Sequence, residues 1–190
     1  RLFGLHHDKM TLLVIGGSLG AGTINHSTSE CIEKGITSHG MQIIWQTGKA
    51  YFNTMRLKFP KESYSDVHMF PFIDRMDLAY AAADIVVSRA GAIAISELCI
   101  VGKPAILIPS PNVAEDHQTH NAEALSRKGA AILLKDQDAE ARLFSVIDNL
   151  RENPDQRESL KNNIKSLGIR DAASHIAEEA LKRIKRNPVK

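Results

Sequence analysis

A segment that begins at Ser88 has the residue types of a phosphate-binding turn. The apolar run Ile85–Val87 before it predicts a buried strand, and the small and apolar residues from Ala92 onward predict a helix. Gly91 stands between them, where the lack of a side chain lets a ligand approach the backbone. The free N–H groups and the positive dipole end of the new helix then face an anion, for which phosphate is the best candidate.

Glu97 lies in the second turn of the same predicted helix, within reach of a sugar attached to that phosphate. Carboxylates accept hydrogen bonds from ribose hydroxyls, so the pair of features indicates a nucleotide. The alternative is a surface carboxylate with no ligand. Arg89 also has two interpretations, a contact with phosphate or an internal ion pair.

Strand-like and helix-like segments alternate along the chain up to residue 134. The predicted strands are Thr11–Ile15, Gln42–Gln46, Val67–Phe70, Ile85–Val87, Ala105–Ile108 and Ala131–Leu134. The predicted helices are 24–38, 51–58, 76–82, 92–101, 118–128, 139–152, 155–167 and 171–185. Strands separated by helices imply an α/β fold with a Rossmann-like, doubly wound, parallel six-stranded sheet. We expect residues 1–190 to form one domain, with the helices of residues 139–185 packing on it.

The bulk composition excludes several classes of protein. A net charge of +2 and 5% aromatic residues give no support for nucleic-acid binding. No apolar run approaches the roughly 20 residues that span a bilayer, and no signal peptide is visible. Cys31 and Cys99 lack metal-ligand spacing, so we expect reduced, buried thiols. Basic residues from Lys182 to Lys190 predict a solvated helix end, with contact to an anionic membrane surface as the alternative.

Three further loops follow predicted strands at the edge where such sheets bind ligands. The glycine-rich loop Gly16–Gly22 has the flexibility to wrap a phosphate, although a tight turn without a ligand is the alternative. It does not contain Gly-x-Gly-x-x-Gly, and Gln46 stands where an NAD-binding fold needs an acidic residue. Gly48–Ala50 lacks the Ser or Thr and the upstream glycine of a P-loop.

The other two loops begin at Phe70 and at Glu115. In the first, a base is expected to lie against Phe72 while the backbone of Ile73 reads its edge, unless Phe72 packs in the core. In the second, Gln118 and Asn121 share one face of a helix, and their amides suit sugar hydroxyls. Asp116 fits an ordinary N-cap. The neighbouring histidines His117 and His120 diverge around the helix start, so no metal site is expected.

Together these motifs resemble one known family. They are Gly17–Ala21, Phe72–Asp74, Ser88–Ala92, Ser96–Glu97, and Asp116–Gln118 with Asn121. The family is the peptidoglycan lipid-intermediate glycosyltransferase, which adds N-acetylglucosamine to undecaprenyl-diphospho-muramoyl-pentapeptide. Its members have two Rossmann-like domains of the GT-B type, and the resemblance covers only the C-terminal, donor-binding half. The resemblance therefore implies an N-terminal acceptor domain outside this chain, which is expected to be a piece of a longer protein.

The resemblance also implies a contact with UDP-N-acetylglucosamine for each matching position. Ser18 would face the diphosphate, and Phe72 and Ile73 would bind uracil. The backbone N–H groups of Ala92, Ile93 and Ala94 would meet phosphate and sugar. Glu97 would hold the ribose, and Gln118 and Asn121 the N-acetylglucosamine. The chain departs from the family at Gly22, often arginine, at Ala94, often threonine, and at His117, often glutamine.

The implied reaction is an inverting displacement at the anomeric carbon without metal or cofactor. The catalytic base and the site for the lipid-linked acceptor would lie in the N-terminal half, and the full-length enzyme would act in the cytoplasm at the inner face of the bacterial membrane. Two alternatives stay open: the donor half of another UDP-sugar transferase that acts on a glycolipid, and a nucleotide-binding module without chemistry. A nicotinamide oxidoreductase is disfavoured by the missing glycine fingerprint.

Overall fold

A parallel six-stranded sheet forms the centre of the molecule. The computed structural model describes residues 2–17, 19–111 and 116–186. The strands are β1 (Met10–Ile15), β2 (Met41–Gln46), β3 (Val67–Phe70), β4 (Ile85–Ser88), β5 (Ala105–Leu107) and β6 (Ile132–Leu133). Their order across the sheet is β3-β2-β1-β4-β5-β6, and all neighbouring pairs are parallel. This is the doubly wound Rossmann order, so the fold class predicted from the sequence is confirmed.

The central strand β1 shows how the sequence builds two cores. Its register runs from Met10 opposite Met41 to Ile15 opposite Gln46, and Leu12 pairs with Ile85 on the other side. Successive side chains of a strand point to opposite faces. Leu12 therefore packs in the core on one face of the sheet, and Leu13 in the core on the other.

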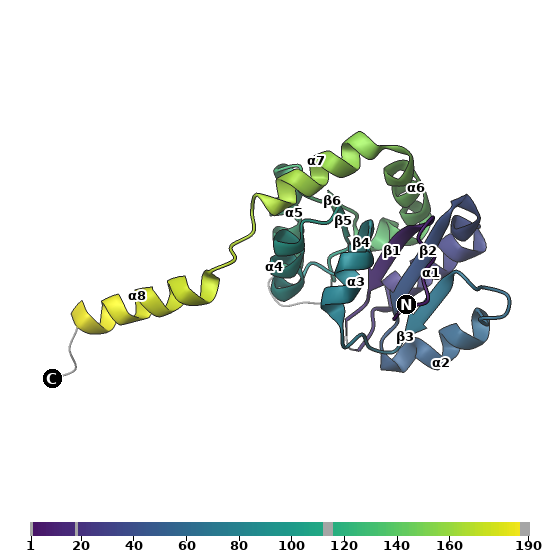
Figure 1. Ribbon diagram of the computed structural model, residues 1–190, viewed down its shortest axis with the longest axis horizontal. Helices are drawn as coiled ribbons and strands as arrows, with labels where there is room; N and C mark the ends of the chain where they lie inside the picture. The colour runs from purple at the N-terminus through teal and green to yellow at the C-terminus, as the bar shows by residue number, and fades with distance from the viewer. Residues whose placement is uncertain (1, 18, 112–115, 187–190) are drawn as a thin grey trace.

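Helices cover both faces of the sheet (Figure 1). Those that contribute to the first core are α1 (Gly22–Glu33), α2 (Lys49–Lys58) and α6 (Ala139–Glu152). Those that contribute to the second core are α3 (Met76–Ala82), α4 (Ala92–Val101) and α5 (His117–Arg127). Helix α7 (Pro154–Lys165) places Leu160 in the first core and Ile164 in the second. Cys31 and Cys99 are free and buried, as expected.

Glycine ends the first helix earlier than the sequence analysis predicted. The predicted helix 24–38 is two elements, α1 and a 3-10 helix, Ile36–His39. Gly35 lies between them with φ 80°, a left-handed conformation that interrupts an α-helix. The remaining predicted boundaries coincide with the observed ones or differ from them by at most two residues.

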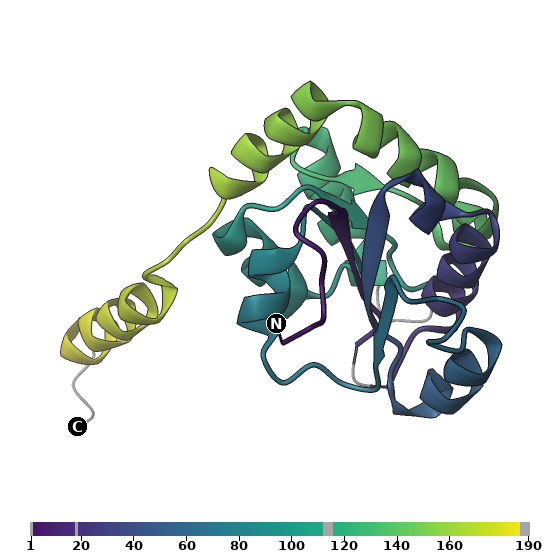
Figure 2. The same cartoon turned by 45° about the vertical axis from the view of Figure 1, so that its right-hand side comes forward.

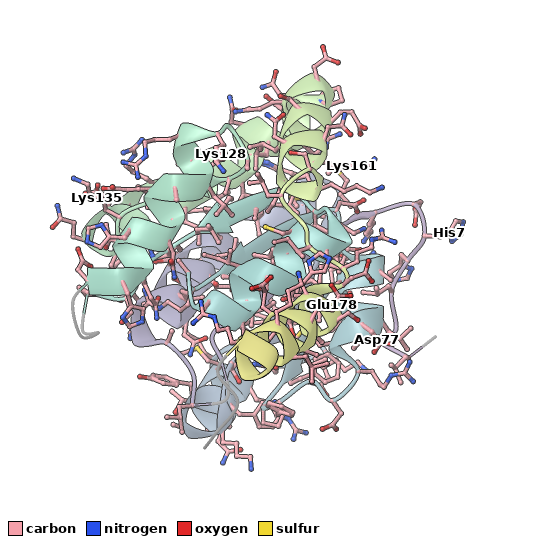
Figure 3. All side chains as sticks on the ribbon, turned by 90° about the vertical axis from the view of Figure 1, so that its left-hand side faces the viewer. His7, Asp77, Lys128, Lys135, Lys161 and Glu178 are labelled. Carbon is pink, nitrogen blue, oxygen red and sulfur yellow. The ribbon has the colours of Figure 1, made fainter. Side chains whose placement is uncertain are left out.

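Helix α8 (Ala172–Arg186) stands apart from the body of the molecule in both Figure 1 and Figure 2. Every residue from 169 to 183 is exposed, including Ile176 at 70% and Leu181 at 57%. The expectation that all helices of residues 139–185 pack on the domain is therefore wrong for α8. Figure 3, in which α8 faces the viewer, labels Glu178 on this helix, and Lys128 and Lys161 among the charged side chains of the body. No helix in the described part of the chain is both long and apolar enough to cross a membrane.

Candidate functional site

The sheet order places the ligand edge between β1 and β4, because these neighbours lead to helices on opposite faces. Doubly wound sheets bind ligands outside the carboxyl ends of their strands at this point. The loops that leave β1 and β4 begin here, and they are the glycine-rich loop and the turn before α4 predicted from the sequence.

The glycine-rich loop lies directly against the loop after β2. The N–H of Gly16 donates to the carbonyl of Gln46 at 3.2 Å. A Cβ atom on Gly48 would lie 2.2 Å from the backbone nitrogen of Gly20, and one on Gly20 would lie 2.5 Å from the carbonyl oxygen of Thr47. Both glycines also have positive φ, so this close approach requires glycine on each side. Ser18, the residue expected to face the diphosphate, lies outside the described residues.

The N-terminus of α4 is open to solvent. Its first internal hydrogen bond runs from Ile95 N–H to the carbonyl of Gly91 at 3.0 Å, so the N–H groups of Ala92, Ile93 and Ala94 precede the helical ladder. Ala92 and Ile93 are exposed, and Ala94 is partly buried. Gly91 has an extended backbone, φ −68° and ψ 150°, and a Cβ atom on it would meet nothing within 4 Å. Neither the backbone conformation nor the packing in the described residues requires glycine at this position. The absence of a side chain leaves space beside the N–H groups of Ala92, Ile93 and Ala94, which donate to no described residue.

Glu97 lies further along α4, and its exposed carboxylate has one hydrogen-bond partner among the described residues. The hydroxyl of Tyr80, on α3, donates to Glu97 Oε2 at 3.1 Å. Tyr80 is only 3% exposed, and burial, followed by the charge of Glu97, raises the pKa of its phenol. The bond leaves Oε1 of Glu97 as an acceptor on the surface.

Arg89 forms the internal ion pair rather than an open phosphate contact. Its Nη1 donates to Asp136 Oδ1 and, at 3.1 Å each, to the carbonyls of Ile108 and Pro109. Asp136 Oδ2 accepts in turn from the hydroxyl of Thr23 on α1 at 2.8 Å. Of the two interpretations of Arg89 from the sequence, the structure shows the internal ion pair, and a contact between Arg89 and phosphate stays a prediction.

Two amides of α5 hold loops of the same edge. Gln118 Oε1 accepts from the N–H of Ser110 at 2.9 Å, which leaves the amide nitrogen of Gln118 as a donor. Asn121 Nδ2 donates to the carbonyl of Ala90 at 3.1 Å, which leaves its amide oxygen as an acceptor. Both side chains are partly buried. Within the part of the chain that the structure describes, the two amides thus present one free donor and one free acceptor, a combination that suits hydroxyl groups.

Asp116 departs from the ordinary N-cap that the sequence suggests. It occupies the N-cap position of α5 with φ 48°, but its side chain makes no capping bond. Instead Oδ1 accepts from the hydroxyl of Thr119 at 2.6 Å. In the described part of the chain, no group of three His, Cys, Asp or Glu residues could hold a metal ion.

In the loop after β3, Phe72 is exposed whereas Ile73 is buried. Phe72 is 45% exposed, so core packing does not account for its ring. Ile73 is buried, and its N–H donates to Gln46 Oε1 at 3.0 Å. The side chain of Gln46 thereby connects this loop to the end of β2 and occupies the Ile73 N–H, so the carbonyl is the Ile73 backbone group that a base would meet in the predicted site.

Four residues of this edge were not assigned a site role from the sequence: Gln46, Tyr80, Ser110 and Asp136. The sequence identifies Gln46 only as a residue unsuited to NAD, and a polar residue at the end of an apolar strand is the signal for its structural role. Asp136 lies 47 residues from Arg89, and no pattern in one sequence connects them. A hollow of about 620 Å³ lies elsewhere, lined by residues of β3, α2 and the N-terminal segment, and it contains none of the predicted site residues.

Comparison with known protein families shows the family to which this chain belongs. Residues 11–176 match the model described as the glycosyltransferase family 28 C-terminal domain. The chain belongs to this family. The match covers the six strands, except Met10 at the start of β1, and all described site residues, so the family resemblance expected from the motifs is confirmed.

Two curated relatives carry the same name, UDP-N-acetylglucosamine--N-acetylmuramyl-(pentapeptide) pyrophosphoryl-undecaprenol N-acetylglucosamine transferase. The protein from Flavobacterium psychrophilum is 48% identical over 180 residues, which are 95% of this chain and 48% of that protein. The protein from Parabacteroides distasonis is 47% identical over 180 residues, 95% of this chain and 49% of that protein. The chain therefore spans about half the length of the curated relatives it matches.

A solved structure shares the fold. The crystal structure of Acinetobacter baumannii MurG superposes with a TM-score of 0.80 at 24% identity, over 94% of this chain and 51% of that chain. The six-stranded α/β unit thus matches one half of a GT-B glycosyltransferase.

Proposed function

We propose that this chain is the donor-binding domain of a glycosyltransferase that moves N-acetylglucosamine from UDP-N-acetylglucosamine to undecaprenyl-diphospho-muramoyl-pentapeptide. The observation that carries the proposal is 48% identity over 95% of the chain to a relative named for this reaction. The open N-terminus of α4 at the switch point of the sheet supports a diphosphate site in the same place.

In the proposed complex, each loop of the edge contacts one part of the donor. Ser18 and the N–H groups of Ala92, Ile93 and Ala94 bind the diphosphate. The Ile73 carbonyl and the ring of Phe72 bind uracil. Glu97 accepts from the ribose hydroxyls, and Gln118 and Asn121 bind hydroxyls of N-acetylglucosamine.

The reaction forms a bond between an acceptor hydroxyl oxygen and the anomeric carbon and breaks the bond from that carbon to the diphosphate. Negative charge grows on the departing UDP, and the N-terminus of α4 stabilises it without a metal ion. The acceptor's proton passes to a base outside this chain. The acceptor domain is supplied by the remainder of the protein, and the lipid-linked acceptor places the whole enzyme at the cytoplasmic face of the membrane.

Calorimetry on this chain with UDP, UDP-N-acetylglucosamine, ADP and NAD tests the proposal. We expect the two uridine ligands to bind in the micromolar to millimolar range, about −4 to −8 kcal/mol, because one side of the cleft is missing. ADP and NAD should bind more weakly than UDP. Absence of UDP binding contradicts the nucleotide site.

A transfer assay with a lipid-linked acceptor tests the division into halves. We expect no transfer by this chain and transfer by the full-length protein. Robust transfer by the 190-residue chain would contradict the proposal of a donor-binding half. Product analysis of the full-length enzyme separates the muramoyl-pentapeptide acceptor from a glycolipid.

A further inference from the structure

A buried hydroxyl group reaches the one carboxylate expected to bind ribose. Tyr80, on α3, is 3% exposed and packs in the core to which α3 and α4 both contribute, whereas Glu97 is exposed on α4. The 3.1 Å bond from the Tyr80 hydroxyl to Glu97 Oε2 is the protein contact of this carboxylate. The bond therefore connects the core of the domain to its ligand edge.

The geometry of α4 directs the carboxylate toward the diphosphate site. Side chains of a helix lean toward its N-terminus, so Glu97 extends over the turn that contains Ile93. Ile93 is 77% exposed, and its N–H is one of the three unpaired donors at the helix start. A nucleotide whose diphosphate meets those donors has its ribose on the side where Glu97 extends.

An exposed glutamate normally samples several rotamers, and fixing it in one costs conformational entropy on binding. The Tyr80 hydroxyl reduces this cost, because it binds Oε2 and leaves Oε1 of this exposed residue as an acceptor for a ligand. The tyrosine ring is itself fixed by the packing around it. The carboxylate is therefore ordered before a ligand arrives.

We propose that Tyr80 is a positioning residue of the nucleotide site, which holds the Glu97 carboxylate in the orientation that accepts from the ribose diol of a nucleoside diphosphate. The inference rests on the proposed donor site. The positioning role differs from a purely structural role. In a structural role the Tyr80–Glu97 bond only joins α3 to α4, and its loss would change ligand affinity only as far as it destabilises the fold.

The test compares UDP with 2′,3′-dideoxy-UDP, which lacks the diol, on the whole chain. Tyr80→Phe removes one buried oxygen and keeps the ring. We expect its affinity for UDP to fall about three- to tenfold, as for the loss of one ordinary hydrogen bond, while its affinity for the dideoxy ligand changes less than about twofold. Tyr64→Phe is the matched control, since Tyr64 packs on the core at the other face of the sheet. It should leave both affinities unchanged.

A second variant keeps the core intact. Glu97→Asp retains the charge but withdraws the carboxylate from the Tyr80 hydroxyl, and it is expected to reduce the preference for UDP over the dideoxy ligand. In a Glu97→Ala background, Tyr80→Phe should have no further effect on UDP affinity, because the two side chains act together.

The possible outcomes distinguish a failure of the Tyr80 positioning role from a failure of the proposed donor site. Wild-type chain that fails to bind UDP contradicts the proposed donor site and the inference together. Wild-type chain that binds UDP, with equal losses for both ligands in Tyr80→Phe, overturns the positioning role alone. An undiminished UDP preference in Glu97→Asp overturns it as well, even if Tyr80→Phe does not fold.

Discussion

Arg89 and Asp136 form an ion pair that joins loops far apart in the sequence at the carboxyl edge of the sheet. Arg89 precedes α4 and also donates to the carbonyls of Ile108 and Pro109, while Asp136 accepts from Thr23 at the start of α1. Both charged side chains are less than one fifth exposed, at 18% and 19%. The pair therefore orders the edge that the proposed donor occupies.

Asp136→Asn is expected to destabilise the fold and to weaken UDP binding. The substitution leaves the Arg89 charge partly buried without its counterion, so the free energy of unfolding should fall by about 1–3 kcal/mol. Urea unfolding measures this loss. Asp77→Asn, at the exposed Arg75–Asp77 pair, is the control and should leave stability unchanged. Equal stability of Asp136→Asn and wild type would show that the pair is not needed to order these loops.

The sequence predicted the sheet because its strands are continuous apolar runs bounded by turn residues. Leu12 and Ile43 on one face and Leu13 and Ile44 on the other are fully buried, as such runs require in a sheet covered on both faces. The glycine-rich loop and the turn at Gly91 were recognised for the same reason, since their residue types report on local backbone geometry.

Contacts between distant segments were not predictable in this way. The Gln46–Ile73 and Tyr80–Glu97 hydrogen bonds depend on which elements the fold brings together. The spacing of residues in the sequence does not predict which elements become neighbours. In helix α8, a local sequence pattern is present but the burial that it predicts is not observed. Its periodic apolar residues predict a buried face, but Ile176 and Leu181 are exposed because no described element covers them.

Gly91→Ala is expected to separate folding from ligand binding. A Cβ atom at this position meets nothing within 4 Å in the free chain, and the backbone is extended. Stability should therefore change by less than about 1 kcal/mol, because the lower entropy of the unfolded chain offsets the weaker preference of alanine for the N-cap position that Gly91 occupies. The methyl group occupies the space beside the helix N-terminus, so affinity for UDP should fall about tenfold, as for the loss of one charge-assisted hydrogen bond.

Thermal unfolding and calorimetry of Gly91→Ala measure the two effects. Uridine, which has no phosphate, is the control ligand and should bind the variant and the wild type alike. Unchanged UDP affinity in a stable Gly91→Ala variant would place the diphosphate elsewhere.

Gln118→Ala is expected to weaken UDP-N-acetylglucosamine more than UDP. The proposed sugar contact uses the amide nitrogen left free by the bond to Ser110, and its loss should cost about 0.5–1.5 kcal/mol for the sugar nucleotide. Calorimetry with both ligands measures the difference, and Gln137→Ala, an exposed amide in the 3-10 helix before α6, is the control. Equal losses for UDP and the sugar nucleotide would mean that Gln118 supports the Ser110 loop and does not contact the sugar.

Cys31 is expected to make the fold sensitive to alkali. Burial raises the pKa of its thiol from 9.0 to about 12, so the thiol stays neutral in the folded chain while it ionises near pH 9 in the unfolded chain. This contribution to stability is complete below pH 9 and is lost as the pH rises toward 12. Between pH 8 and pH 10.5 the loss should be about 2 kcal/mol.

Urea unfolding of the wild type and of Cys31→Ala across that range isolates the contribution of this thiol. The variant is less stable at pH 8, because the core loses volume, but its stability should decline less with pH than that of the wild type. Parallel curves for the two proteins would contradict the assigned cause.

Glu97→Gln tests the assignment of the ribose ligand most directly. The amide keeps the size of the side chain, and its oxygen can still accept from the Tyr80 hydroxyl, so the contact between α3 and α4 is preserved. The charge and one acceptor are lost, which should cost about 1.5–3 kcal/mol, or about ten- to a hundredfold in affinity. The loss should be the same for UDP and UDP-N-acetylglucosamine, because both carry the ribose, and much smaller for 2′,3′-dideoxy-UDP. Calorimetry with the three ligands measures it, with Glu123→Gln on α5 as the matched control. If Glu97→Gln binds UDP as tightly as the wild type while its unfolding temperature drops, Glu97 stabilises the helix pair and the ribose has another partner.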